Sequence, residues 1–379
     1  MYEWRGSALG ATRRQGYNHL VCPARYSGRA QFHASHDLRR RQKQNKGEVR
    51  ITDYKIPMTK NKSEEEYRQE QIEQIMRLKA ERNAVIIVHN YQRDEIQDIA
   101  DISGDSLALS RAAVRTDAKV IIFCGVYFMA ESASILNPDK MVLLPVREAG
   151  CPMADMVNPE KLLALKKEYP DAAVVCYVNS SAEVKAVSDI CCTSSNAIEI
   201  VRAMKEKRII FIPDKNLGMW VQRYVPDKEI ILWKGFCPTH IRVTAEDVLK
   251  AKEGFPNSEF VAHPECNPEV LDLADHVCST AGMFKYVKSS NTKRFLIGTE
   301  SGMLHKLRKE NPDKEFLLPS SKLICANMKL TTLGWIAHSL QELVYEVKLP
   351  EETRKKACRS LKRMLEVTKE SAGAAIAGY

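Results

Sequence analysis

The sequence predicts an α/β protein built from three similar three-layer αβα units, with parallel sheets arranged around a pseudo-threefold axis. Two observations support this prediction. From Ser63 onward, short apolar runs alternate with helical stretches, which is typical of parallel α/β architecture. A repeat of about 87 residues then occurs three times in one register.

The first unit opens with a helix and a buried strand. Ser63 and Glu66 have the spacing of a capping box, and apolar residues then recur at helical intervals. The apolar run of residues 84–88 predicts a strand that ends at His89.

Three strand ends share one register. They place polar residues at equivalent positions, 88 and 86 residues apart, at His89, Tyr177 and His263. Seventeen residues after each lies a hydroxyl residue that we expect to open a helix: Ser106, Ser194 and Thr280. Thirty-four residues after each lies a second predicted strand, around Phe123, Phe211 and Ile297.

A third predicted strand in each unit leads to a cysteine. These strands begin near Val142, Ile230 and Phe316, and the cysteines that follow are Cys151, Cys237 and Cys325. The cysteines are 86 and 88 residues apart, so each unit contributes one at an equivalent position. Because units of this size bury too little surface to be stable alone, we expect them to pack together and bring the three loops to one central site.

The repeat divides the chain into parts. We expect α/β units at residues 63–170, 171–255 and 256–332, C-terminal helices packing on the core at 333–379, and a basic extension at 1–57. The extension carries 12 Lys and Arg against 4 Asp and Glu, which accounts for +8 of the net charge of +9. It shows no apolar periodicity, and we interpret it as disordered or as sequence upstream of the true start. A transit peptide and a nucleic-acid-binding tail are the alternatives.

The composition argues against a membrane protein, a secreted protein and a nucleic-acid-binding protein. No run of about 18 apolar residues occurs, so the sequence predicts no membrane span. Eleven cysteines without a secretory signal indicate a reducing compartment, and we expect a cytoplasmic location. Since residues 58–379 carry a net charge of only +1, we expect no nucleic-acid partner for the units.

Each strand end presents two polar side chains on one side, because residues i and i+2 of a strand point the same way. The pairs are His89 and Tyr91, Tyr177 and Asn179, and His263 and Glu265. Ligands bind at this end of parallel strands, so we expect the pairs to line one polar cavity. Glu265 is the candidate general base, with His89 and His263 as proton donors or carboxylate binders.

The three hydroxyl residues have two interpretations. Ser and Thr often cap helices, which would make Ser106, Ser194 and Thr280 structural. A helix start with a hydroxyl and free N–H groups also binds phosphate or carboxylate. Three such starts at one cavity favour a multiply anionic substrate.

Three converging thiolates indicate a soft metal or a cluster. An electron-transfer [4Fe–4S] protein normally supplies four cysteines, whereas three leave one iron open as a Lewis acid. Zinc on Cys151, Cys237, Cys325 and His240 is the alternative, although structural zinc sites usually gather ligands in close pairs. Cys124 and Cys176 are interpreted as core residues, and Cys22 and Cys358 as incidental. Four others are interpreted as small buried groups, with a place behind the metal ligands as the alternative: Cys191, Cys192, Cys266 and Cys278.

A set of short motifs resembles one known family. They include His89-Asn-Tyr-Gln, Gly104-Asp-Ser-Leu-Ala-Leu-Ser, Tyr177-Val-Asn-Ser, Pro213-Asp-Lys-Asn-Leu-Gly, Lys234-Gly-Phe-Cys-Pro-Thr-His, His263-Pro-Glu-Cys, Ile297-Gly-Thr-Glu and Ile324-Cys-Ala-Asn-Met. Over roughly residues 84–330 the chain resembles the quinolinate synthase family.

The resemblance implies a [4Fe–4S] cluster on Cys151, Cys237 and Cys325, with His240 nearby. It implies that the substrate site consists of His89, Tyr91, Ser106, Tyr177, Asn179, Ser194, His263, Glu265 and Thr280, with Phe128 and Met129 near a substrate tunnel. Among these, the implied catalytic residues are Glu265, His89, Tyr91, Tyr177 and His263.

The implied reaction condenses iminoaspartate with dihydroxyacetone phosphate, releasing phosphate and water to give quinolinate for NAD biosynthesis. A functional link to an L-aspartate oxidase or dehydrogenase is implied as well. Two other classes stay open: a different open-cluster hydro-lyase, and a non-catalytic metal-containing binding or redox-sensing protein.

Overall fold

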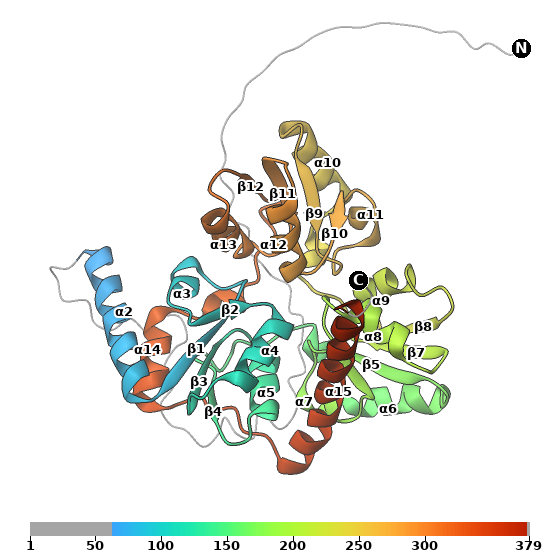
Figure 1. Cartoon of the computed structure of the whole chain (residues 1–379), viewed down its shortest axis with the longest axis horizontal. Helices are drawn as coiled ribbons and strands as arrows, with labels where there is room; N and C mark the ends of the chain where they lie inside the picture. The colour runs from blue at the N-terminus through green and yellow to red at the C-terminus, as the bar shows by residue number, and fades with distance from the viewer. Residues whose placement is uncertain (1–62, 377–379) are drawn as a thin grey trace, which may run out of the picture. The chain divides into compact units, whose positions relative to one another are not determined.

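A computed structural model describes residues 63–376 of the chain, with side chains to residue 368. The basic extension predicted at residues 1–57 lies outside the described part. The described residues contain three four-stranded sheets with alternating helices (Figure 1), and all strand pairs within each sheet are parallel. The predicted α/β class with three repeated units is confirmed.

The first sheet has the strand order β2-β1-β3-β4. Its strands are β1 (Ala84–His89), β2 (Ile102–Gly104), β3 (Val120–Cys124) and β4 (Met141–Leu143). The helices of this unit are α2 (Glu64–Glu81), α3 (Asp94–Asp98), α4 (Ser106–Arg115) and α5 (Tyr127–Leu136). Helix α2 begins with the predicted capping box, in which Ser63 and Glu66 bind each other's backbone N–H groups.

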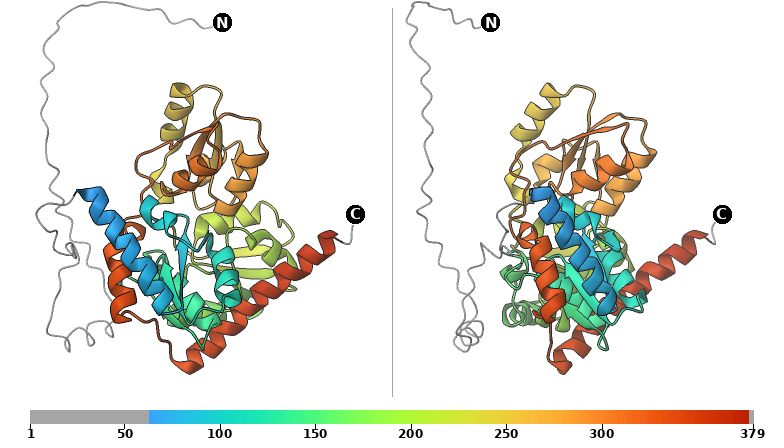
Figure 2. Two further views of the ribbon diagram at one scale, coloured as in Figure 1. Left: turned by 60° about the vertical axis from the view of Figure 1, so that its left-hand side comes forward. Right: turned by 90° about the vertical axis from the view of Figure 1, so that its left-hand side faces the viewer.

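Helices cover both faces of the first sheet. Ile86 and Val88 of β1 pack with residues of α2 and of α14 (Leu333–Glu342), whereas Val85 and Ile87 lie in the core with α4 and α5. Helices α2 and α14 lie side by side (Figure 2). A helix from the C-terminal part of the chain therefore completes the three layers of the first unit.

The second sheet repeats the same order, β6-β5-β7-β8. Its strands are β5 (Ala173–Tyr177), β6 (Ile190–Cys192), β7 (Arg208–Ile212) and β8 (Glu229–Leu232). Its helices are α6 (Pro159–Glu168), α7 (Ala182–Ala186), α8 (Ala197–Ala203) and α9 (Lys215–Gln222). The long helix α15 (Glu351–Ile376) packs on α7 and β6.

The third sheet has the order β10-β9-β11-β12. Its strands are β9 (Glu259–Ala262), β10 (His276–Val277), β11 (Arg294–Gly298) and β12 (Glu315–Leu317). Its helices are α10 (Ala245–Gly254), α11 (Pro268–Leu271), α12 (Thr280–Ser289) and α13 (Met303–Glu310). Phe260 packs with α10 and α11 on one face, and Val261 packs with α12 and α13 on the other.

The structure departs from the sequence prediction at two kinds of position. Each unit has a fourth strand of two or three residues (β2, β6 or β10), which is too short to show a periodic pattern. Ser194 does not open a helix, because α8 begins only at Ala197. The Asn196 side chain accepts the Thr193 N–H at 2.7 Å and holds the intervening residues in a turn.

Among residues 63–376, no helix is both long enough and apolar enough to cross a membrane.

Candidate active site

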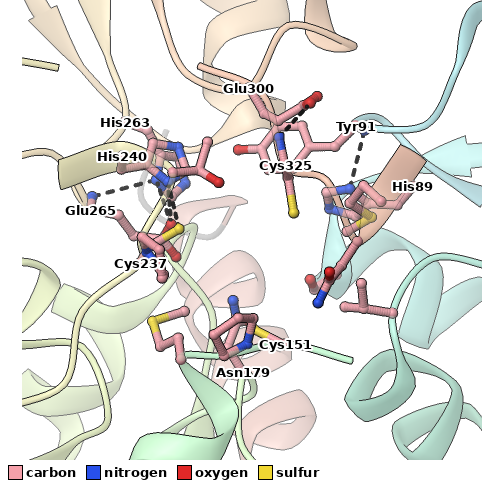
Figure 3. Close-up of a pocket in the computed structure, with 18 of the residues that line it drawn as sticks. His89, Tyr91, Cys151, Asn179, Cys237, His240, His263, Glu265, Glu300 and Cys325 are labelled. Carbon is pink, nitrogen blue, oxygen red and sulfur yellow. Dashed lines mark hydrogen bonds and ion pairs between the residues drawn. The ribbon is translucent and has the colours of Figure 1, made fainter. Parts of the chain in front are cut away.

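Residues from all three units line one cavity of about 270 Å³. The twelve predicted site residues all contribute to its wall: His89, Tyr91, Ser106, Cys151, Tyr177, Asn179, Ser194, Cys237, His263, Glu265, Thr280 and Cys325. Phe128, Met129 and His240 line it as well. Figure 3 shows labelled side chains from the three units directed toward this shared space.

Side chains at the cavity connect the three units. Ser195 of the second unit donates to Asp105 Oδ2 of the first at 2.7 Å, and its Oγ lies 2.8 Å from Ser279 Oγ of the third. Asp105 and Ser279 are the N-cap residues of α4 and α12. The starts of these two helices are thus joined through one serine beside the cavity.

The three cysteine loops have the same local structure. A 3₁₀ helix begins three residues after each cysteine, giving η1 (Ala154–Met156), η2 (His240–Arg242) and η3 (Met328–Leu330). Each cysteine carbonyl accepts an N–H from four residues later, at 3.3, 3.2 and 3.3 Å for Cys151, Cys237 and Cys325. The predicted equivalence of the three cysteines therefore extends to their backbone.

The three cysteines are half-buried and form no disulfide. Burial raises the pKa of Cys151 to about 12, against the effect of the Ala154 N–H group. Burial likewise raises the pKa values of Cys237 and Cys325 above the ordinary range of a thiol. Since a metal ion binds the thiolate and displaces its proton, thiols gathered in this way suit a metal or cluster.

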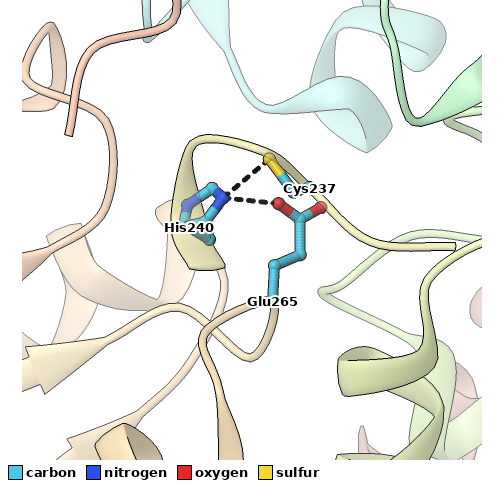
Figure 4. Close-up of side chains that lie close together, drawn as sticks. All are labelled: Cys237, His240 and Glu265. Atoms are coloured by element: carbon cyan, nitrogen blue, oxygen red, sulfur yellow. Dashed lines mark hydrogen bonds and ion pairs between the residues drawn. The ribbon is translucent and has the colours of Figure 1, made fainter. Parts of the chain in front are cut away.

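His240 connects one cysteine to the predicted base (Figure 4). Its Nδ1 lies 3.1 Å from Cys237 Sγ and 2.7 Å from Glu265 Oε2, while its Nε2 lies 2.9 Å from Thr299 Oγ1. Ligand atoms of Cys237, His240 and Glu265 all lie within 4.8 Å of one another. This trio could hold a single metal ion, with Thr299 orienting the imidazole.

Glu265 is held as an ionised carboxylate. Burial opposes the charge, but the imidazoles of His240 and His263, which attract a carboxylate when they are protonated, and hydrogen bonds from His240 and Tyr177 lower the pKa of Glu265 to about 2. The Tyr177 hydroxyl donates to Glu265 Oε1 at 2.7 Å. Burial and Glu265 together raise the pKa of Tyr177 well above its usual value, so this phenol keeps its proton.

The two predicted histidines are held in the neutral form. Burial lowers the pKa of His89 to about 3, with His263 and Lys329 acting in the same direction. Burial also lowers the pKa of His263 to about 3, although Glu265 opposes this shift. A neutral imidazole carries one N–H donor and one acceptor, so both residues can position polar groups at neutral pH.

The hydroxyl residues at the helix starts are not the capping residues. Asp105 accepts the Ala108 N–H at 2.8 Å, and Ser279 accepts the Gly282 N–H at 3.2 Å. Ser106 and Thr280 are the first helical residues instead. The capping interpretation is therefore wrong for these hydroxyls, which line the cavity at N-terminal helix ends.

Three polar residues of the site were missed. Thr299 Oγ1 lies 2.6 Å from the Tyr91 hydroxyl, and Glu300 lines the cavity, both directly after β11. Asp105 lines the cavity next to Ser106. No site residue was predicted after the second predicted strand of a unit, although Thr299 and Glu300 follow β11, and Asp105 lies one position before the predicted Ser106.

Among the cysteines that the structure describes, only Cys151, Cys237 and Cys325 line the cavity. Five others are buried: Cys124, Cys176, Cys191, Cys192 and Cys266. Cys278 and Cys358 are half-buried, and Cys22 lies outside the described residues.

Most of the chain is similar to proteins of one known family. A family model described as quinolinate synthetase A protein matches residues 73–366. A quinolinate synthase of Geobacter sp. (strain M21) is 58% identical over 296 residues, which cover 78% of this chain and 97% of that protein. The quinolinate synthase of Geotalea uraniireducens (strain Rf4) is 55% identical over 80% of this chain and 100% of its own length. The chain therefore belongs to the quinolinate synthetase A family.

Proposed function

We propose that this enzyme condenses iminoaspartate with dihydroxyacetone phosphate and releases phosphate and water to form quinolinate for NAD biosynthesis. Family membership supports the reaction, and one structural observation supports the chemistry: three repeat-equivalent cysteines meet neutral histidines and an ionised glutamate at a single cavity. An L-aspartate oxidase or dehydrogenase is the proposed source of iminoaspartate.

The proposed cofactor is a [4Fe–4S] cluster held by Cys151, Cys237 and Cys325. Their thiols come from three different units and line the same cavity, which fits a cluster better than a site made from paired ligands. A cluster with three protein ligands supplies an open iron that acts as a Lewis acid toward oxygen groups of a bound molecule.

The anionic groups of the substrates are proposed to bind at the starts of α4 and α12. Ser106 and Thr280 present hydroxyls there, and the helix starts present N–H groups with the positive end of the helix dipole. Ser194 extends this surface, with its Oγ 3.1 Å from His263 Nε2. Asn179 adds an amide beside them.

Proton movement is proposed to centre on Glu265. As an ionised carboxylate it accepts hydrogen bonds from Tyr177 and His240, which lowers its basicity. A substrate that takes up either donor would raise the pKa of Glu265 and make it a stronger base. His89 and His263 would orient carboxylates, and Tyr91 would shape the space that receives the triose.

The closeness of Cys237, His240 and Glu265 favours a second candidate, a mononuclear zinc site. Anaerobic purification of the full chain, with iron, sulfide and zinc analysis and a quinolinate assay by mass spectrometry, distinguishes the two. The proposal predicts about four irons and four sulfides per chain, with product formed from both substrates. Stoichiometric zinc without iron, or an iron-loaded chain that forms no quinolinate, would contradict it.

A further inference from the structure

Two buried acidic side chains occupy equivalent positions in the second and third units. Asp214 and Glu300 are 86 residues apart, and each lies two residues after the end of its strand, β7 or β11. Both residues are 0% exposed. The proposed chemistry uses neither, and a buried carboxylate is costly unless hydrogen bonds compensate for the lost water.

Each carboxylate accepts the backbone N–H of the cysteine in its own unit. Asp214 Oδ2 lies 3.1 Å from the nitrogen of Cys237, and Glu300 Oε1 lies 3.1 Å from the nitrogen of Cys325. Figure 3 shows Glu300 next to Cys325. The same contact is therefore made twice, in units that differ in sequence around it.

The second oxygen of each carboxylate is bound as well. Asp214 Oδ1 accepts the Leu217 N–H at 2.8 Å, and Glu300 Oε2 accepts the Gly302 N–H at 2.7 Å. Lys329 adds an ion pair to Glu300 at 3.1 Å. Each acidic side chain thus connects a cysteine loop to the chain at the start of the next helix, and it uses both of its oxygens to do so.

A backbone hydrogen bond docks the same loop in all three units. The donors are the N–H groups of Tyr127, Lys215 and Ser301, and the acceptors are the carbonyls of Ala149, Gly235 and Leu323, at 2.7, 2.9 and 2.8 Å. In the second unit a Cβ at Gly235 would lie 2.4 Å from the carbonyl oxygen of Pro213. The loop therefore lies directly against the segment that carries Asp214.

The first unit lacks a carboxylate at this place. By the repeat spacing, Val126 is equivalent to Asp214 and Glu300. Besides the backbone bond from Tyr127, the loop of Cys151 is held by a side chain from outside its unit, because Asn327 Nδ2 donates to the Gly150 carbonyl at 2.7 Å. The three otherwise equivalent cysteines are consequently attached in two different ways.

We propose that Asp214 and Glu300 are positioning residues, which hold the loops of Cys237 and Cys325 in place through their backbone N–H groups before any metal is bound. Asp214→Asn and Glu300→Gln keep the shape of the side chains. An amide, however, offers one acceptor oxygen and turns an NH₂ group toward an N–H donor. Each variant should therefore loosen one cysteine loop and leave the other in place.

The test measures the alkylation rate of each cysteine by iodoacetamide in the metal-free full chain, resolved by mass spectrometry. Asp214→Asn should raise the rate at Cys237 about tenfold and leave Cys325 unchanged, and Glu300→Gln should do the reverse. Each variant is the control for the other. Equal changes at both cysteines, or none, would overturn the proposal. If Asp214→Asn does not fold, the alkylation rates of Cys325 and Cys237 in Glu300→Gln decide whether the proposal holds.

A second measurement concerns the metal-loaded chain and rests on the proposed function. Iron release to a bathophenanthroline chelator should be about tenfold faster in both variants. Removing the charge of Glu300 should also raise the cluster's reduction potential. Glu131→Gln is the matched control, because Glu131 is buried and accepts the Ala182 N–H, not the N–H of a cysteine.

The two measurements separate the two proposals. A wild-type chain without iron contradicts the proposed function, while the alkylation rates still decide the roles of Asp214 and Glu300. A chain that binds iron but releases it at the wild-type rate in both variants contradicts the positioning role.

Discussion

The Tyr177 hydroxyl donates a hydrogen bond to Glu265 Oε1 at 2.7 Å, although the two residues are 88 positions apart and belong to different units. Tyr177 ends β5, and Glu265 follows β9 by three residues. The contact therefore forms only when the second and third units pack together. It also contributes to keeping Glu265 ionised, so the packing of the units sets the charge in the cavity.

Tyr177→Phe removes this donor and should raise the pKa of Glu265. A hydrogen bond to a charged group contributes about 1.5–3 kcal/mol, so kcat should change by roughly ten- to a hundredfold. The acidic limb of the pH–rate profile should also move to higher pH. Tyr286→Phe is the control, since Tyr286 stacks on His276 away from the cavity. A wild-type rate and pH profile in Tyr177→Phe would show that this contact does not matter for turnover.

Glu265→Gln should abolish most of the activity without loss of iron. General base catalysis contributes about 10²–10⁴-fold, and we expect quinolinate formation to fall by that factor. Iron and sulfide contents should stay at the wild-type level, because the proposed cluster ligands are unchanged. Retained turnover in an iron-loaded variant would exclude Glu265 as the base.

His89 should make the stability of the metal-free protein depend on pH. Its pKa falls from 6.5 to about 3 on folding, so the unfolded chain binds one more proton than the folded chain between these values. His89 therefore lowers the free energy of unfolding as pH falls from 6.5 toward 3, by up to about 1.4 kcal/mol per pH unit. His89→Asn should reduce the slope of stability against pH by about one proton in denaturant titrations from pH 4 to 6. An unchanged slope would contradict the neutral, buried state of His89.

Substitutions of Ser106 and of its neighbour Asp105 should have different effects, the first on substrate binding and the second on helix capping. Ser106→Ala should raise the KM for dihydroxyacetone phosphate, with little change in melting temperature, because Ser106 does not cap α4. Asp105→Ala removes the cap and should destabilise the protein by about 1 kcal/mol. The assay is steady-state kinetics paired with thermal unfolding. A loss of stability in Ser106→Ala without a change in KM would assign Ser106 a structural role.

Much of the fold could be predicted because the same pattern of strands and helices occurs three times in the sequence. A buried strand such as Val120–Cys124 is a short apolar run that could also be a helix segment, but its equivalents at Arg208–Ile212 and Arg294–Gly298 resolve the ambiguity. Short edge strands such as His276–Val277 carry too few residues for any pattern. The start of α8 was missed because a local Asn196 side-chain contact, not helix propensity, sets it.

Site residues that occur at equivalent positions of the repeat could be predicted, whereas contacts between different units could not. Cysteines at 86 and 88 residues apart indicated a common site, and the structure places all three at one cavity. The contact between His240 and Glu265 depends on how two units pack, which no local pattern encodes. Thr299 contacts Tyr91 across two units and was missed for the same reason.

Cys151, Cys237 and Cys325 are proposed to hold a cluster with one open iron. Mössbauer spectroscopy of the full chain, loaded anaerobically with ⁵⁷Fe and measured with and without dihydroxyacetone phosphate, tests it most directly. We predict four irons, of which one changes its isomer shift and quadrupole splitting when the substrate is added. Four irons that all stay unchanged, or a chain that binds only zinc, would contradict the claim.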